Sequence, residues 1–287
     1  TDLFANAAIE FIQRQSKSGE PWFCYLPFNA PHLPSAKNKK PGQENEWQAP
    51  DWAFREYGLS PEEPDSHKRY RAVVTALDRA IGRVLNALEE SGTADNTFLF
   101  FMSDNGGLST SEGHPTSNLP LRGGKGWMYE GGIREPLIVR WPGMTAAGSV
   151  CNQVVTSTDF YPTILEITGL KARPDQHRDG MSFVPLLKGE TRERGPVLWH
   201  YPHYGNQGGA PAGAVRDGRW KLIEWYEDER VELFDLESDI GETRNLAERQ
   251  PDRARAMRTT LHRLLKETGA VMPARNDRFD KSKREGR

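Results

Sequence analysis

An apolar segment ends abruptly on residues that could bind a metal ion. In FLFFMSDNGG, Phe98 to Gly107, four of the first five residues are aromatic or Leu, and the segment then stops at Asp104, Asn105 and two glycines. Carboxylate and amide oxygens are hard ligands suited to Ca²⁺, and less favourably to Mg²⁺. Because Asp, Asn and Gly also form ordinary turns, this segment alone leaves a plain turn and a metal site both open.

A lysine and a histidine are candidates for acid chemistry. Lys125 lies in LRGGKGWMYEGGIREP, where flanking glycines would let the backbone approach a ligand and the ammonium would attract an anion. The same sequence is also compatible with a surface loop that carries a solvated lysine. His32, between Pro31 and Pro34 in NAPHLP, could donate a proton near neutral pH, although a lone histidine is more often structural or exposed.

Two further histidines lie among aromatic residues. His200 and His203 occur in WHYPHYGNQGG, three positions apart. Such a pair could suggest a metal, but no third ligand lies nearby in this strand and loop segment. A pocket wall or plain packing is therefore the favoured interpretation.

The elements expected around these residues are those of an α/β domain. Helices are predicted at the N-terminus, over Ser66–Glu90 and over Ser157–Gly169, and apolar strands over Trp22–Phe28, Thr97–Met102 and within residues 136–143. A helix that leads into a fully apolar strand is typical of a largely parallel sheet covered by helices, in which ligands lie at the carboxyl ends of strands. Asp104 and Asn105 stand at such an end. The polar residues 35–65 are predicted to be a long surface excursion.

The pattern changes after Gly189. Short alternating strands joined by turns predict an antiparallel meander, followed by an amphipathic helix over Pro251–Thr268. We therefore expect an α/β domain over residues 1–189, a small sheet-and-helix subdomain over 190–273, and a disordered tail over 274–287.

Composition excludes some partners. The 38 basic and 40 acidic residues leave a net charge of −2, which disfavours tight binding of nucleic acid or an anionic membrane. No run of eighteen apolar residues occurs, so no transmembrane segment is predicted. The sequence does not indicate an oligomeric state.

Taken together, these segments resemble the sulfatase family, the calcium-dependent sulfuric ester hydrolases of the alkaline phosphatase superfamily. The resemblance runs along nearly the whole chain, and its most specific feature is SDNGG followed by GKGWMYEGG. It implies part of an alkaline-phosphatase-like mixed, mostly parallel sheet flanked by helices, plus a small C-terminal antiparallel sheet with a packed helix. The implied substrate is a small-molecule or carbohydrate sulfate monoester, as for an arylsulfatase, and the implied parent protein is periplasmic or secreted.

The resemblance also implies roles for particular residues. Asp104 and Asn105 match calcium ligands, Lys125 matches the lysine that contacts the sulfate and the leaving oxygen, and His32 matches a histidine near the bridging oxygen. Candidate walls of the substrate pocket are His114, Trp127, His200, His203 and Tyr204.

The sequence departs from the family at the nucleophile. Sulfatases make a formylglycine from the Cys or Ser of C/S-x-P/A-x-R, and their first two calcium ligands are adjacent aspartates; neither pattern occurs here. We therefore expect the C-terminal part of a sulfatase, inactive by itself. The alternatives are a non-catalytic fragment and a phosphate or phosphonate ester hydrolase of the same superfamily.

Overall fold

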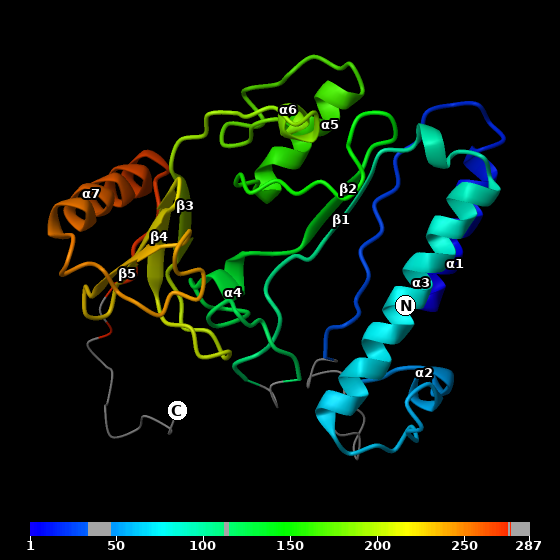
Figure 1. Cartoon of the computed structure of the whole chain (residues 1–287), viewed down its shortest axis with the longest axis horizontal. Helices are drawn as coiled ribbons and strands as arrows, with labels where there is room; N and C mark the ends of the chain where they lie inside the picture. The colour runs from blue at the N-terminus through cyan, green and yellow to red at the C-terminus, as the bar shows by residue number, and fades with distance from the viewer. Residues whose placement is uncertain (34–46, 112–114, 275, 277–287) are drawn as a thin grey trace. The chain divides into compact units, whose positions relative to one another are not determined.

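The chain forms two compact units. The computed structural model describes residues 1–33, 47–111, 115–274 and 276 (Figure 1). The first unit contains Thr1–Ala94, Ser103–Glu135 and Val197–Arg287, and the second contains Asp95–Met102 and Pro136–Pro196. The C-terminal sheet and helix thus share a unit with the segment that carries Lys125. The predicted boundary between residues 189 and 190 stays a prediction, and the predicted tail lies outside the described residues except for 274 and 276.

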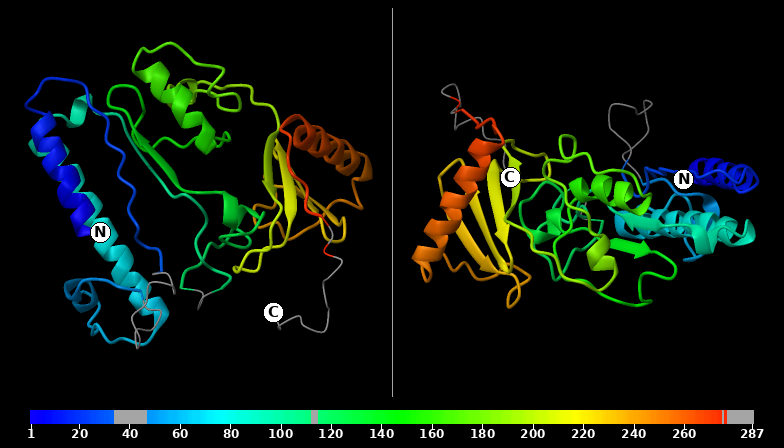
Figure 2. Two further views of the ribbon diagram at one scale, coloured as in Figure 1. Left: turned by 180° about the vertical axis from the view of Figure 1, so that it is seen from behind. Right: turned by 90° about the horizontal axis from the view of Figure 1, so that it is seen from above.

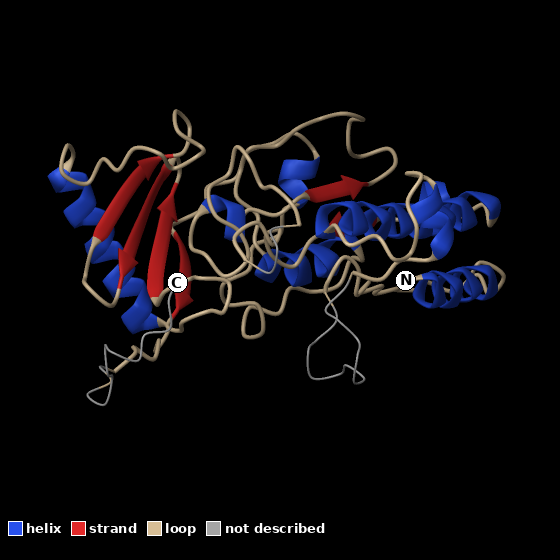
Figure 3. Cartoon of the chain, turned by 90° about the horizontal axis from the view of Figure 1, so that it is seen from below, coloured by secondary structure: helices blue, strands red, loops and turns tan. Residues whose placement is uncertain are grey.

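Two long helices pack together in the first unit. α1 (Asp2–Gln15) lies along α3 (Ser66–Glu90), as Figures 1 and 3 show. The predicted bounds of α3 are confirmed. Its N-cap is Asp65, whose carboxylate accepts hydrogen bonds from the amides of His67 and Lys68, satisfying backbone donors that the helix itself cannot pair. No helix in the described ranges combines the length and apolarity needed to cross a bilayer.

Two predictions for residues 21–65 are wrong in part. Residues 21–29 have no regular secondary structure, although a strand was predicted over Trp22–Phe28. A strand exists only with a hydrogen-bonded neighbour, and an apolar run does not specify that neighbour. Residues 34–46 lie outside the described chain, but the remainder of the predicted surface excursion contains α2 (Asp51–Arg55) with buried Phe54, packed against α3.

The second unit contains one pair of short antiparallel strands, followed by short helices. β1 (Leu99–Met102) pairs antiparallel with β2 (Leu137–Arg140), and η3 (Ser157–Asp159), α5 (Phe160–Ile167) and α6 (Val184–Leu187) follow. The α/β class is confirmed. The parallel pairing expected for this part is not seen between the two strands that the structure describes here, and Phe101 and Met102 are exposed rather than buried.

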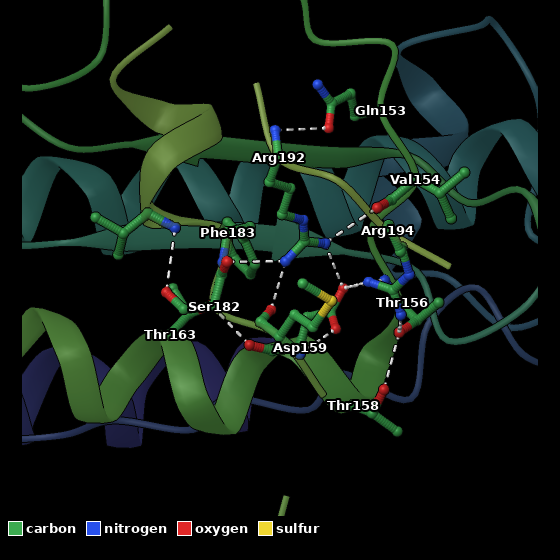
Figure 4. Close-up of polar contacts among 12 residues, drawn as sticks. Gln153, Val154, Thr156, Thr158, Asp159, Thr163, Ser182, Phe183, Arg192 and Arg194 are labelled. Atoms are coloured by element: carbon green, nitrogen blue, oxygen red, sulfur yellow. Dashed lines mark hydrogen bonds and ion pairs between the residues drawn. The ribbon is translucent and has the colours of Figure 1, made fainter. Parts of the chain in front are cut away.

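A buried carboxylate holds the second unit's chain segments together (Figure 4). Asp159 accepts hydrogen bonds from the amides of Thr156 and Met181, each at 2.9 Å, from Arg192 Nη2 at 2.9 Å, and from Arg194. Burial would raise the pKa of Asp159, but these donors hold it below its usual range. The start of α5 is therefore tied to residues 181–194 by a fully paired charge.

The C-terminal sheet has two differently packed faces. Its antiparallel order is β3 (Val197–Tyr201), β4 (Ala212–Asp217), β5 (Trp220–Trp225) and β6 (Val231–Asp235), as predicted. One face, with Val215, Leu222 and Leu233, packs against α7 (Pro251–Glu267), which crosses the strands in Figure 2. We call this the α7 face. The opposite face packs against Met128 and Tyr129, and we call it the turn face. The sheet therefore supports the segment that carries Lys125.

Candidate active site

Lys125 lies on a tight turn held by backbone hydrogen bonds. Its amide donates to Gly107 O at 3.2 Å, and the amide of Trp127 donates to Gly124 O at 3.0 Å. Gly126 has φ +85°, a left-handed conformation that favours glycine. Because Gly107 follows Asn105 by two residues, the Lys125 turn is bonded directly to the turn that follows β1.

The two turns and α4 (Glu130–Ile133) pack backbone against backbone. Gly106 N donates to Gly132 O at 3.3 Å, and a Cβ added at Gly106 would overlap the carbonyl group of Gly131. A Cβ at Gly124 would lie 2.5 Å from Gly107 O. Gly106, Gly124, Gly131 and Gly132 are thus required by the close approach of backbones, and the structure brings the two predicted segments together.

His32 lies beside the lysine. Its Nε2 is 3.1 Å from Lys125 Nζ, and its Nδ1 is 2.7 Å from Leu33 O. A carbonyl oxygen can only accept, so Nδ1 carries the hydrogen and Nε2 offers a lone pair to the ammonium. In this arrangement Lys125 donates to the imidazole, and the lysine is the candidate proton donor of the pair.

The turn after β1 carries one carboxylate, and a second lies near it. Asp104 is exposed and Asn105 is half-buried. Burial, and then the nearby Asp104 carboxylate, raise the pKa of Glu135 to about 8, and Glu135 Oε1 is buried without a hydrogen-bond partner in the part of the chain that the structure describes. The Asp104 and Glu135 carboxylates disfavour each other as anions, and a hard cation such as Ca²⁺ bound beside them and the Asn105 amide oxygen would relieve that repulsion.

The described residues supply only part of such a metal site. Among them, no group of three or more His, Cys, Asp or Glu side chains could hold a metal ion. Glu135 was not predicted. It is one of several charged residues in its segment, and only the close approach of its carboxylate to Asp104 singles it out.

Trp127 meets the loop after β3 next to the Lys125 turn. Its Nε1 donates to Gln207 O at 3.0 Å, and Thr110 Oγ1 donates to the same oxygen at 3.1 Å. In that loop His203 and Tyr204 are exposed, and the His203 ring packs edge-on against Tyr201 at 5.6 Å. The structure therefore brings Trp127 and the loop together, and that they line one substrate pocket stays a prediction.

His200 is separated from this group. Its Nδ1 lies 2.8 Å from Tyr226 Oη and its Nε2 lies 3.0 Å from Val271 O. The expectation that His200 shares a pocket with Trp127 is corrected, because alternate strand residues face opposite sides: Trp199 and Tyr201 pack on the turn face, whereas Leu198 packs on the α7 face. His114 lies outside the described residues.

The Lys125–His32 pair lies on a turn that is hydrogen-bonded to the segment carrying Asp104 and Asn105, and comparison with known proteins shows the class of protein to which this α/β chain belongs. The family described as Sulfatase matches residues 1–170, and the family described as N-sulphoglucosamine sulphohydrolase, C-terminal, matches residues 124–270. The chain belongs to the sulfatase family.

Curated relatives are longer than this chain. A protein named Sulfatase from Formosa agariphila is 36% identical over an alignment of 270 residues, and the match covers 88% of this chain and 46% of that protein. N-acetylgalactosamine-6-sulfatase from Mus musculus is 32% identical over 250 residues, covering 86% of this chain and 42% of that protein. The chain thus spans less than half the length of both relatives.

Solved structures show the same fold. The crystal structure of Ps i-CgsB in complex with k-i-k-neocarrahexaose gives a TM-score of 0.78 at 29% identity, covering 92% of this chain and 54% of that one. A second protein, solved in complex with its substrate D-glucosamine-2-N,6-O-disulfate, gives a TM-score of 0.60 at 29% identity, covering 72% of this chain and 41% of that one. The α/β architecture with its C-terminal antiparallel sheet is therefore that of the sulfatases.

Proposed function

We propose that this chain binds the sulfate group of a sulfate monoester and supplies the proton that the leaving oxygen needs during hydrolysis. Membership in the sulfatase family supports the reaction class. The observation that carries the proposal is the 3.1 Å approach of Lys125 Nζ to His32 Nε2. In this approach Lys125 is the proton donor and is oriented by the His32 imidazole, which accepts its hydrogen bond. The Lys125 turn is hydrogen-bonded to the turn that carries Asp104 and Asn105.

The roles of the two side chains follow from their hydrogen bonds. The ammonium of Lys125 attracts the sulfuryl oxygens and stabilises charge that builds up as the ester is attacked. When the S–O bond to the leaving group breaks, its electron pair stays on the leaving oxygen, which takes a proton from Lys125. His32 accepts a hydrogen bond from the ammonium through Nε2 and thereby fixes its direction. His32 then acts on the reaction by orienting the acid.

Asp104 and Asn105 would hold a Ca²⁺ ion, with Mg²⁺ the less favoured choice. When bound, the ion would act as a Lewis acid toward the sulfuryl oxygens. The repulsion between the Asp104 and Glu135 carboxylates supports this assignment, because a bound cation would relieve it. We expect Asp104→Ala to abolish Ca²⁺ binding in calorimetry, whereas Asp78→Ala, at an exposed position of α3, should leave it unchanged. Equal Ca²⁺ affinity of the two variants would remove Asp104 from the site.

Hydrolysis also requires a nucleophile. The formylglycine precursor motif C/S-x-P/A-x-R does not occur in the 287 residues. We therefore infer that the formylglycine is contributed by residues other than these, and that the 287-residue chain binds sulfate without turnover. Release of nitrophenol from 4-nitrophenyl sulfate by this chain would contradict that inference.

A carbohydrate sulfate is the substrate class that we favour. Relatives and similar structures act on or bind sulfated sugars by name, including N-acetylgalactosamine-6-sulfatase and the protein solved with D-glucosamine-2-N,6-O-disulfate. In this chain, Trp127 and the exposed Tyr204 lie in the two segments that meet beside Lys125, and aromatic side chains offer flat apolar surfaces to sugar rings.

The proposal is tested by anion binding to the 287-residue chain. Inorganic sulfate should bind in calorimetry, and Lys125→Met should weaken it by about tenfold to a hundredfold, because a hydrogen bond to a charged group contributes roughly 1.5–3 kcal/mol. Lys17→Met changes an exposed lysine just after α1 and serves as the matched control. Equal affinity of both variants would refute the role of Lys125, and tighter binding of inorganic phosphate than of sulfate would favour a phosphate ester hydrolase instead.

A further inference from the structure

A fully buried ion cluster lies behind the Lys125 turn. Lys221, Glu130 and Glu242 are 0%, 1% and 0% exposed. Lys221 Nζ lies 2.9 Å from Glu130 Oε1 and 2.9 Å from Glu242 Oε1. The attraction of Lys221 and Arg216 lowers the pKa of Glu130 despite its burial, whereas burial raises the pKa of Glu242. The candidate mechanism uses none of these three side chains directly.

Glu242 also caps the helix that supports the active-site turns. The amide of Glu130, at the start of α4, donates to Glu242 Oε2 at 2.6 Å across 112 residues of sequence. The N-cap residue of α4, Tyr129, provides no side-chain cap. Since the first amides of a helix have no partner within it, Glu242 supplies one that the local sequence lacks.

A second contact joins Glu242 to the beginning of the glycine-rich segment. Arg122 Nη1 donates to Glu242 O at 2.8 Å, and its guanidinium lies 3.9 Å over the Tyr129 ring. Gly131 N donates to Arg122 O at 2.8 Å. Glu242 therefore contacts both ends of the segment that contains Lys125, one through its carboxylate and the other through its carbonyl oxygen.

α4 contacts both the turn after β1 and the Lys125 turn through backbone atoms rather than through flexible side chains. The backbone of α4 contacts the turn after β1 through Gly132 O and Gly106 N, at 3.3 Å. A Cβ at Gly132 would lie 2.5 Å from Gly124 O, next to Lys125. Because these glycine backbones are in direct contact, α4 cannot move without moving one of the two turns. A shift of α4 must therefore shift Lys125 relative to His32, or Asn105 relative to Lys125.

We propose that Glu242 is a positioning residue for the Lys125–His32 pair: with Lys221 and Arg122 it fixes α4, and α4 fixes the two turns. Burying three charged groups is costly, and an apolar cluster of similar volume is often as stable or more stable. The inference rests on the proposed function only for its consequence in sulfate binding; the positioning of His32 is independent of it.

The test uses two readouts on the 287-residue chain. The first is the imidazole nitrogen NMR signal of His32 in ¹⁵N-histidine-labelled protein, which reports whether Nε2 still accepts the hydrogen bond from Lys125. The second is the affinity for inorganic sulfate. Glu242→Gln preserves shape and removes the charge, and Arg122→Gln breaks the second contact at a residue that is itself exposed.

We expect both variants to shift the His32 signal and to weaken sulfate binding by about tenfold, since losing a supporting shell typically costs a factor of that order. Glu224→Gln is the matched control, because Glu224 is also buried, at 5% exposed, but pairs with Arg258 and His262 on the α7 side of the sheet. It should change neither readout.

Two results would overturn the inference. One is an unshifted His32 signal in both Arg122→Gln and Glu242→Gln; if Glu242→Gln does not fold, Arg122→Gln alone decides. The other is an equal effect of Glu224→Gln, which would show general destabilisation. If wild-type chain binds no sulfate while the His32 signal still responds to Glu242→Gln, the proposed function fails and the positioning role stands.

Discussion

Replacing Gly106 by alanine should destabilise the first unit by several kcal/mol. The added Cβ would overlap Gly131 O and lie 2.8 Å from Gly131 C and 2.9 Å from the Cα of Gly132. All three atoms belong to backbone, so none can rotate away. Overpacking of this kind costs about 1–3 kcal/mol, and loss of the bond from Gly106 N to Gly132 O adds about 1 kcal/mol.

The same chemical change at Gly82 should have the opposite sign. Gly82 lies inside α3, and an added Cβ would have nothing within 4 Å. Alanine in a helix interior is favoured over glycine by about 0.5–1 kcal/mol. The two variants should therefore differ by about 3–5 kcal/mol in the free energy of unfolding, although each adds one methyl group.

Urea unfolding monitored by circular dichroism measures this difference. Wild-type, Gly82→Ala and Gly106→Ala chains should show similar slopes and different midpoints, with Gly106→Ala the lowest. Equal midpoints for the two variants would show that the turn after β1 does not press against α4, and the packing argument for both functional turns would be wrong.

Two further predictions concern buried or paired carboxylates. Asp159→Asn should lower the unfolding free energy of the second unit by about 3–5 kcal/mol, because Arg192 and Arg194 lose the carboxylate that they share. Asp179→Asn, at an exposed position, is the control. A loss below about 1 kcal/mol in thermal unfolding would show that Asp159 does not hold these segments together. The hydrogen bond from Arg219 lowers the pKa of Asp235 to about 2, so the stability that Asp235 contributes is present above about pH 4 and is lost as the pH falls toward 2. Asp235→Asn should therefore flatten the pH dependence of the unfolding free energy between about pH 4 and about pH 2. An unchanged slope would count against the ion pair.

Local sequence signals predicted the elements whose stability is local. The bounds of α3 followed from its apolar periodicity and the glycine at position 92, and the C-terminal meander followed from short alternating strands. The segment Trp22–Phe28 is equally apolar, yet it forms no strand, because pairing depends on a partner that its own residues do not encode.

The candidate site was only partly accessible from the sequence. His32 and Lys125 are 93 residues apart, and only resemblance to a family suggested that they meet. Lys221 illustrates a signal that was present but missed. In RWKLIEWY it alternates in phase with Ile223 and Trp225, which are buried, so a lysine at that phase indicates a buried charge in need of a partner. The same alternation separates His200 from Trp199 and Tyr201.

The contact between Trp127 and the loop after β3 depends on main-chain atoms. Both Trp127 Nε1 and Thr110 Oγ1 bind the carbonyl oxygen of Gln207, and Gly209 is fixed by the approach of its backbone to Gly126 O. Every amino acid presents such a carbonyl oxygen, so the loop holds the Lys125 turn through main-chain atoms. Replacing the exposed side chain of His203 should therefore change what approaches the turn without moving Lys125.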